Sequence, residues 1–106
     1  MNLQTLYNKL QTTGYPVAYM NFPSDSHVKM PFITYNEAFT NNQRGDDTVY
    51  RKIRHMNVDL WTGEKDTDAE DTLEAVLSDI GFWEVTETYE EEQAVFRRTY
   101  DFEILA

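Results

Sequence analysis

A chain of 106 residues that carries 19 acidic and 9 basic side chains has a formal charge of −10 at neutral pH. An acidic excess of this size opposes binding to a phosphate backbone, because such binding requires clustered lysine and arginine. Cysteine is absent, which excludes disulfides and thiolate metal sites. The length fits one domain, residues 1–106, and an aromatic content of 14% is typical of a chain that folds.

The first residues contain neither a basic segment nor an apolar run, so the sequence does not predict a secretory signal peptide. No stretch of apolar residues is long enough to span a bilayer. We therefore expect a soluble intracellular protein with no membrane partner.

Apolar residues at positions i, i+3, i+4 and i+7 predict a short first helix that ends before Gly14. These residues are Leu3, Leu6, Tyr7 and Leu10. A short strand is expected at 17–21, after Pro16 has excluded further helix. A second strand is expected at 32–38, where β-branched and aromatic residues follow Pro31.

The polar stretch 40–47 has no hydrophobic periodicity and contains glycine, which predicts an exposed, mobile loop between two antiparallel strands. A long third strand is expected at about 48–61. Its second half alternates, with Met56, Val58 and Leu60 on one face, and should lie on the core. Its first half is basic and should project with the loop.

Thr62 and Gly63 are expected to form a turn before a second helix. Thr67 and Glu70 have the spacing of a capping box, and Gly81 suits the left-handed position after the helix. The predicted buried stripe of this helix comprises Ala69, Leu73, Val76, Leu77 and Ile80.

Two more strands are expected at about 83–89 and 94–105, joined by a turn at 90–92. The last strand has the clearest alternation, with Ala94, Phe96, Tyr100, Phe102 and Ile104 predicted on its core face. The order α-β-β-β-α-β-β predicts an α+β fold, with two helices on one face of a mainly antiparallel sheet of four to five strands. The edges of such a sheet could be covered by the next subunit of an assembly.

No catalytic or metal-binding motif is found. The segment 66–71 resembles the start of a calcium loop, but Asp71 and Leu77 stand where that loop requires glycine and glutamate. His27 and His55 are the only histidines and lack a supporting ligand spacing. The sequence therefore predicts a protein that is not an enzyme and has no cofactor or metal.

Charge is segregated along the chain. Between residues 64 and 92, Lys65 is the only basic residue among twelve acidic ones, whereas Arg44, Arg51, Lys52 and Arg54 cluster earlier. Solvated faces would explain this pattern. Head-to-tail association, in which the basic region of one copy meets the acidic region of the next, would explain it as well.

Three stretches carry a resemblance to a known family. They are residues 30–35, MPFITY, residues 55–62, HMNVDLWT, and the helix with an acidic start that follows. In them the chain resembles the tail-terminator and tail-completion (head–tail joining) proteins of long-tailed siphovirus bacteriophages. The resemblance implies a ring, commonly sixfold, that caps the tail tube and presents a docking surface to the head.

The implied partners are further copies of the chain, the tail tube protein and the head–tail connector protein. The copies would form a hexameric ring, starting from a chain that is monomeric before assembly, and DNA would pass through the ring without specific binding. The implied location is the head–tail interface of the virion, and the host cytoplasm during assembly. A head–tail connector of the stopper or adaptor type, and a small acidic DNA mimic that inhibits a host DNA-binding protein, are the alternatives.

Candidate contact residues follow from charge segregation alone. At the subunit interface, the candidates are Arg51, Lys52 and Arg54 of one copy and Glu90, Glu91 and Glu92 of the next. In the loop that would touch the tail tube or connector, they are Asn41, Asn42, Gln43, Arg44, Asp46 and Asp47.

Overall fold

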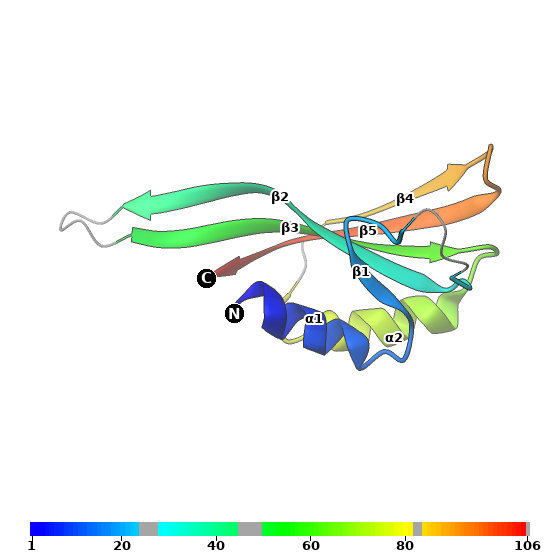
Figure 1. The fold of residues 1–106 in the computed structure, drawn as a ribbon, viewed down its shortest axis with the longest axis horizontal. Helices are drawn as coiled ribbons and strands as arrows, with labels where there is room; N and C mark the ends of the chain where they lie inside the picture. Colours follow the sequence, from blue (N-terminus) through cyan, green and yellow to red (C-terminus); the bar gives the residue numbers. More distant parts are fainter. Residues whose placement is uncertain (24–27, 45–49, 82–83, 106) are drawn as a thin grey trace.

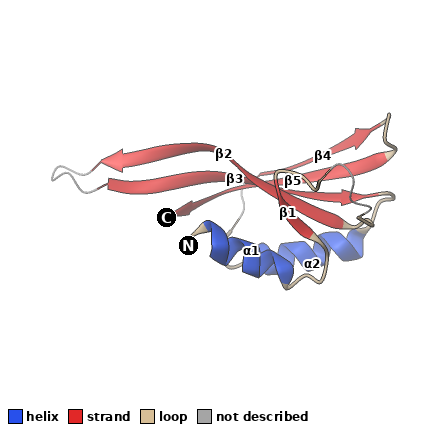
Figure 2. Ribbon diagram, in the orientation of Figure 1, coloured by secondary structure: helices blue, strands red, loops and turns tan. Residues whose placement is uncertain are grey.

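The computed structural model describes residues 1–23, 28–44, 50–81 and 84–105. Its elements are α1 (Leu3–Gln11), β1 (Val17–Tyr19), β2 (Phe32–Arg44), β3 (Tyr50–Thr62), α2 (Thr67–Leu77), β4 (Glu84–Glu90) and β5 (Val95–Leu105). The strands form one five-stranded sheet in the order β1-β2-β3-β5-β4. Both helices lie on the same face of this sheet (Figures 1 and 2). The predicted α+β class and element order are confirmed.

The sheet is mixed. β1 pairs with β2 in parallel, while the other three strand pairs are antiparallel. The N-terminus lies beside the end of β5, where the terminal amine of Met1 donates to the Leu105 carbonyl oxygen at 2.7 Å (Figure 1).

The core lies between the helices and the sheet. Alternate residues of β2, β3 and β5 point toward the helices, as the period-two pattern predicted. The buried side chains are Leu6, Leu10, Ile33, Tyr35, Met56, Val58, Leu60, Ala69, Leu73, Leu77, Tyr100, Phe102 and Ile104. Val76 and Ile80, two members of the predicted stripe of α2, are only half-buried.

The predicted loop at 40–47 is wrong for its first half. Residues 40–44 belong to β2 and pair with residues 50–54 of β3, whereas residues 45–47 lie outside the described residues. A register shift between Glu37 and Phe39 marks an irregularity at the point where β2 passes beyond the core. The polar side chains suggested a loop, but ladder hydrogen bonds join backbone groups and do not require apolar side chains.

The starts of α2 and β5 also differ from the prediction. The cap of α2 is Asp66, whose Oδ1 accepts from the Ala69 N–H at 3.0 Å, so Thr67 is already helical and the predicted capping box is wrong. Ala94 lies in the turn before β5 with a φ of 55°, and Phe96 is only half-buried, so neither joins the core. Gly81 adopts the expected positive φ, at 79°.

Candidate assembly surfaces

A two-stranded arm projects from one end of the sheet. We use this name for residues 38–44 of β2 and 50–54 of β3, which pair with each other up to Arg44 opposite Tyr50. β5 reaches only the base of the arm, where Leu105 lies opposite Ile53. The arm extends the molecule to 51 Å along its long axis, against 28 and 25 Å across it (Figure 1).

The basic candidates of the predicted interface lie on this arm. Arg51 and Lys52 pair through their backbones with Gln43 and Asn42 of β2. Arg54 differs, because its guanidinium Nη1 lies 3.0 and 2.9 Å from the two carboxylate oxygens of Glu37. Arg54 therefore already has an acidic partner within its own chain.

The acidic candidates lie at the opposite end of the long axis. Glu90 is the last residue of β4, and the exposed Glu91 and Glu92 form the turn into β5 (Figure 1). The structure thus brings these three glutamates together and holds them away from the arm of the same chain. A contact between the two groups requires a second molecule.

Some of the twelve acidic residues between positions 64 and 92 form ion pairs with basic side chains of the same chain. Lys65 Nζ lies 2.8 Å from carboxylate oxygens of both Glu70 and Glu87. Arg98 lies 3.5 Å from Glu70, and its Nε donates to the Tyr100 hydroxyl at 2.9 Å. The hydrogen bond from Lys65 holds the pKa of Glu87 below its ordinary value.

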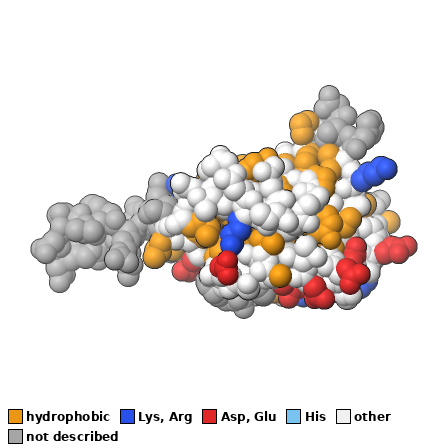
Figure 3. Space-filling view, turned by 90° about the horizontal axis from the view of Figure 1, so that it is seen from below, with side chains coloured by type: hydrophobic (Ala, Val, Ile, Leu, Met, Phe, Trp, Pro, Cys, Tyr) orange, Lys and Arg blue, Asp and Glu red, His pale blue; other side chains and the backbone are white. Residues whose placement is uncertain are grey.

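Sequence reasoning missed this cluster, because its members come from three separate elements. Glu70 lies on α2, Glu87 on β4 and Arg98 on β5. Other acidic residues remain exposed, including Glu64, Asp68 and Asp71. Figure 3 shows acidic side chains gathered toward one end of the face that carries the helices.

A second polar network lies on the face of the sheet opposite the helices. The Thr99 hydroxyl donates to Asp59 Oδ1 at 2.6 Å, and Arg97 Nη2 lies 3.2 Å from Asp59 Oδ2. The guanidinium of Arg97 also lies over the ring of Trp61, 5.2 Å from its centroid. The alternation of β3 and β5 placed these residues on one face, but it did not indicate that Asp59 would be buried.

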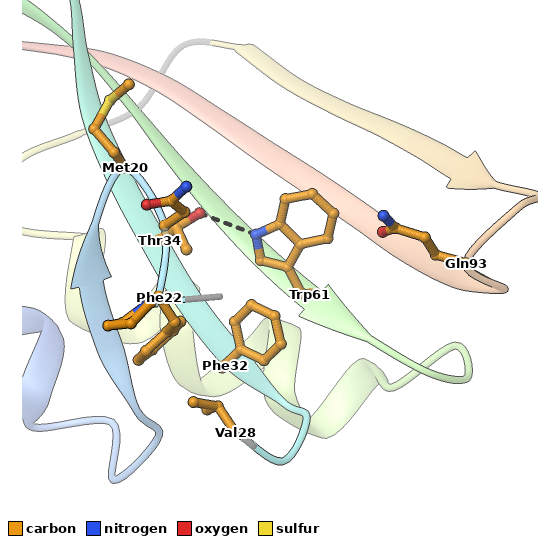
Figure 4. Close-up of a pocket in the computed structure, with 9 residues that line it drawn as sticks. Met20, Phe22, Val28, Phe32, Thr34, Trp61 and Gln93 are labelled. Carbon is orange, nitrogen blue, oxygen red and sulfur yellow. Dashed lines mark hydrogen bonds between the residues drawn. The ribbon is translucent and has the colours of Figure 1, made fainter. Parts of the chain in front are cut away.

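An apolar groove of about 290 Å³ adjoins this network. Figure 4 shows Phe22, Val28 and Phe32 beside Trp61, whose indole N–H donates to the Thr34 hydroxyl at 2.9 Å. Among the residues that the structure describes, those that line the groove carry no acidic, basic or histidine side chain. The aromatic and aliphatic side chains of this lining suit apolar contact.

The structure describes one of the two histidines. His27 lies outside the described residues, while His55 stacks on Phe39 with ring centroids 3.9 Å apart and lies 3.3 Å from Glu103. Within the described ranges, no three His, Asp or Glu side chains form a group that could hold a metal ion. In the same ranges, no helix has the length and apolar content needed to cross a membrane.

Comparison with known proteins gives a match of fold. No protein-family model matches the chain, and no curated protein matches it. Among solved structures, the fold is similar to that of a chain in the virion of a native gene transfer agent (GTA) particle, with a TM-score of 0.71 and 13% sequence identity. The similarity covers 97% of this chain and 92% of the other, so the two chains share one fold over nearly their whole lengths.

Proposed function

We propose that the chain is a structural protein of a phage or prophage virion, with no catalytic role, that caps the tail tube as a ring and provides the head–tail joining surface. The observation that carries the virion role is the near full-length fold similarity to a chain of a gene transfer agent virion. The terminator role rests on the resemblance in residues 30–35 and 55–62 to tail-terminator and tail-completion proteins.

The distribution of charge supports assembly into a ring. The basic residues Arg51 and Lys52 lie on the arm at one end of the molecule, and Glu90, Glu91 and Glu92 lie at the other. A contact between unlike ends is heterologous and closes into a ring when the rotation permits. The net charge of −10 would let DNA pass through such a ring without binding to its wall.

The decisive experiment is a phage or prophage from which this protein has been deleted. The proposal expects tails of uncontrolled length in electron micrographs, since no ring would stop the growth of the tube. Tails of normal length that fail to join heads would contradict the terminator role and indicate a connector. A purified chain that competes with DNA for a basic DNA-binding protein would indicate the acidic mimic instead.

A further inference from the structure

β4 leaves one of its long edges without a strand partner in the described structure. It is the last strand of the sheet and pairs only with β5. Five of its seven side chains are exposed, and only Val85 and Glu90 are half-buried. Backbone N–H and C=O groups along such an edge can pair with another strand.

Within the described part of the chain, the arm offers a second edge without a strand partner, and this edge is as long as β4. β1 covers β2 only at Ile33, Thr34 and Tyr35, with the Tyr19 hydroxyl reaching the Glu37 N–H at 3.3 Å. Residues 38–44 extend beyond this cover and equal β4 in number. A ribbon of only two strands is marginally stable in water, so the arm would gain from a third strand.

We infer that the outer edge of β4 in one copy pairs with the outer edge of residues 38–44 in the next, so that the two sheets become continuous. The inference rests on the head-to-tail association proposed above and specifies its geometry. Strand addition of this kind derives affinity from main-chain hydrogen bonds, which form without an apolar interface.

Charge indicates that the outer edge of β4 pairs with the arm of another copy and not with the β4 strand of another copy. Two β4 strands side by side would bring together Glu84, Glu87 and Glu90 of both copies, and like charges on paired strands are destabilising. Residues 38–44 contain Arg44 as their only charged residue, and Arg51 and Lys52 lie on the adjoining strand. Parallel pairing would set Arg44 beside Glu90.

Single cysteines test the pairing directly, because the chain has none of its own. In a register that uses the whole of both edges, residue 88 lies opposite residue 42 if the strands are parallel and residue 40 if they are antiparallel. Thr88→Cys protein would be mixed with isotope-labelled Asn42→Cys or Thr40→Cys protein in the presence of tail tubes, under mild oxidation. Intact mass would then separate heterodimers from homodimers.

The inference expects about tenfold more heterodimer than a control mixture, since paired edges hold the thiols at a high effective concentration. The control replaces Thr88→Cys with Ala75→Cys, an exposed position on α2. An excess with either arm position supports edge pairing, and the larger of the two gives the strand direction.

Heterodimer at the control level, or a predominance of Thr88→Cys homodimers, would overturn the inference. Ring formation by the unmodified chain is read separately, by electron microscopy in the presence of tail tubes. Rings without an excess of heterodimer would overturn edge pairing and leave the ring proposal standing. An absence of rings would overturn the ring proposal itself.

Discussion

Asp59 shows at the residue scale how a charged side chain is accommodated on the face of the sheet away from the helices. Its side chain is only 4% exposed, and the Thr99 hydroxyl and the Arg97 guanidinium both bind its carboxylate. A buried carboxylate is tolerated when its oxygens are hydrogen-bonded and a cation lies nearby. The position therefore depends on partners that β5 supplies.

Replacement of this carboxylate tests its structural role. Asp59→Ala leaves the Thr99 hydroxyl and Arg97 without their acceptor, and we expect a loss of about 1–3 kcal/mol in the free energy of unfolding. The measurement is urea denaturation. The control is Asp71→Ala on the exposed face of α2, expected within about 0.5 kcal/mol of the parent. Equal losses for the two variants would contradict this account.

Asp101 provides a prediction with a pH dependence. Burial raises the pKa of Asp101 above its ordinary value, and the charges of Glu84, directly opposite on β4, and of Asp59 raise it further. An acid whose pKa is raised by folding contributes stability that is present below its unfolded pKa and lost as pH rises through its folded pKa. The ionised Asp101 therefore destabilises the protein at neutral pH.

Asp101→Asn should raise the free energy of unfolding near neutral pH by about 0.2–1 kcal/mol, because it removes a like charge from a cross-strand pair. Near pH 3 the gain should disappear, since Asp101 is then protonated in both the folded and unfolded states. Urea denaturation at the two pH values, with Asp71→Asn as the control, measures the difference. A gain that is the same at both pH values would rule out a charge effect.

At the scale of the elements, the start of α2 predicts different effects for substitutions at Asp66 and Thr67, because only Asp66 caps the helix. Asp66→Ala removes the acceptor of the Ala69 N–H and should cost about 1 kcal/mol of stability. Thr67→Ala should cost less, because Thr67 is already the first helical residue and is exposed. Urea denaturation of both variants decides between them. A larger loss for Thr67→Ala would restore the capping box that the sequence suggested.

At the scale of the whole molecule, unlike charges at the two ends lead to a charge-swap prediction. Arg51→Glu with Lys52→Glu should abolish rings in electron micrographs, and so should Glu91→Lys with Glu92→Lys, because each places like charges across the proposed interface. An equimolar mixture of the two variants should regain closed rings with an even number of subunits, because alternation of the two variants places unlike charges at every interface. The four substitutions in one chain should restore them.

Thermal unfolding is the control for the charge swap. Glu91 and Glu92 are exposed in the turn before β5, and Arg51 and Lys52 lie on the arm, so the melting temperature should hardly change. Arg54 is left unaltered, because Arg54→Glu would place a second carboxylate beside Glu37 and disturb the fold itself. Rings that persist in either double variant would show that these charges do not face each other.

Much of the fold followed from short-range patterns. The stripe of α1, the alternation of Met56, Val58 and Leu60, and the glycine after α2 predicted local structure, because each records which face is buried or which dihedral angle is needed. The surroundings of the candidate contact residues were less predictable. Glu37 lies 17 positions before Arg54 in sequence, and only the pairing of β2 with β3 brings them together.

The sequence by itself determined the fold class, the element order and the segregation of charge, because periodicity and composition are local properties of the chain. Tertiary structure decided that the polar residues 40–44 extend a strand, that Glu70 joins an ion cluster, and that the arm and the acidic turn lie at opposite ends. These outcomes depend on strand register and on partners distant in sequence. Backbone groups and ion pairs are satisfied by whatever the fold brings near, which local patterns do not specify.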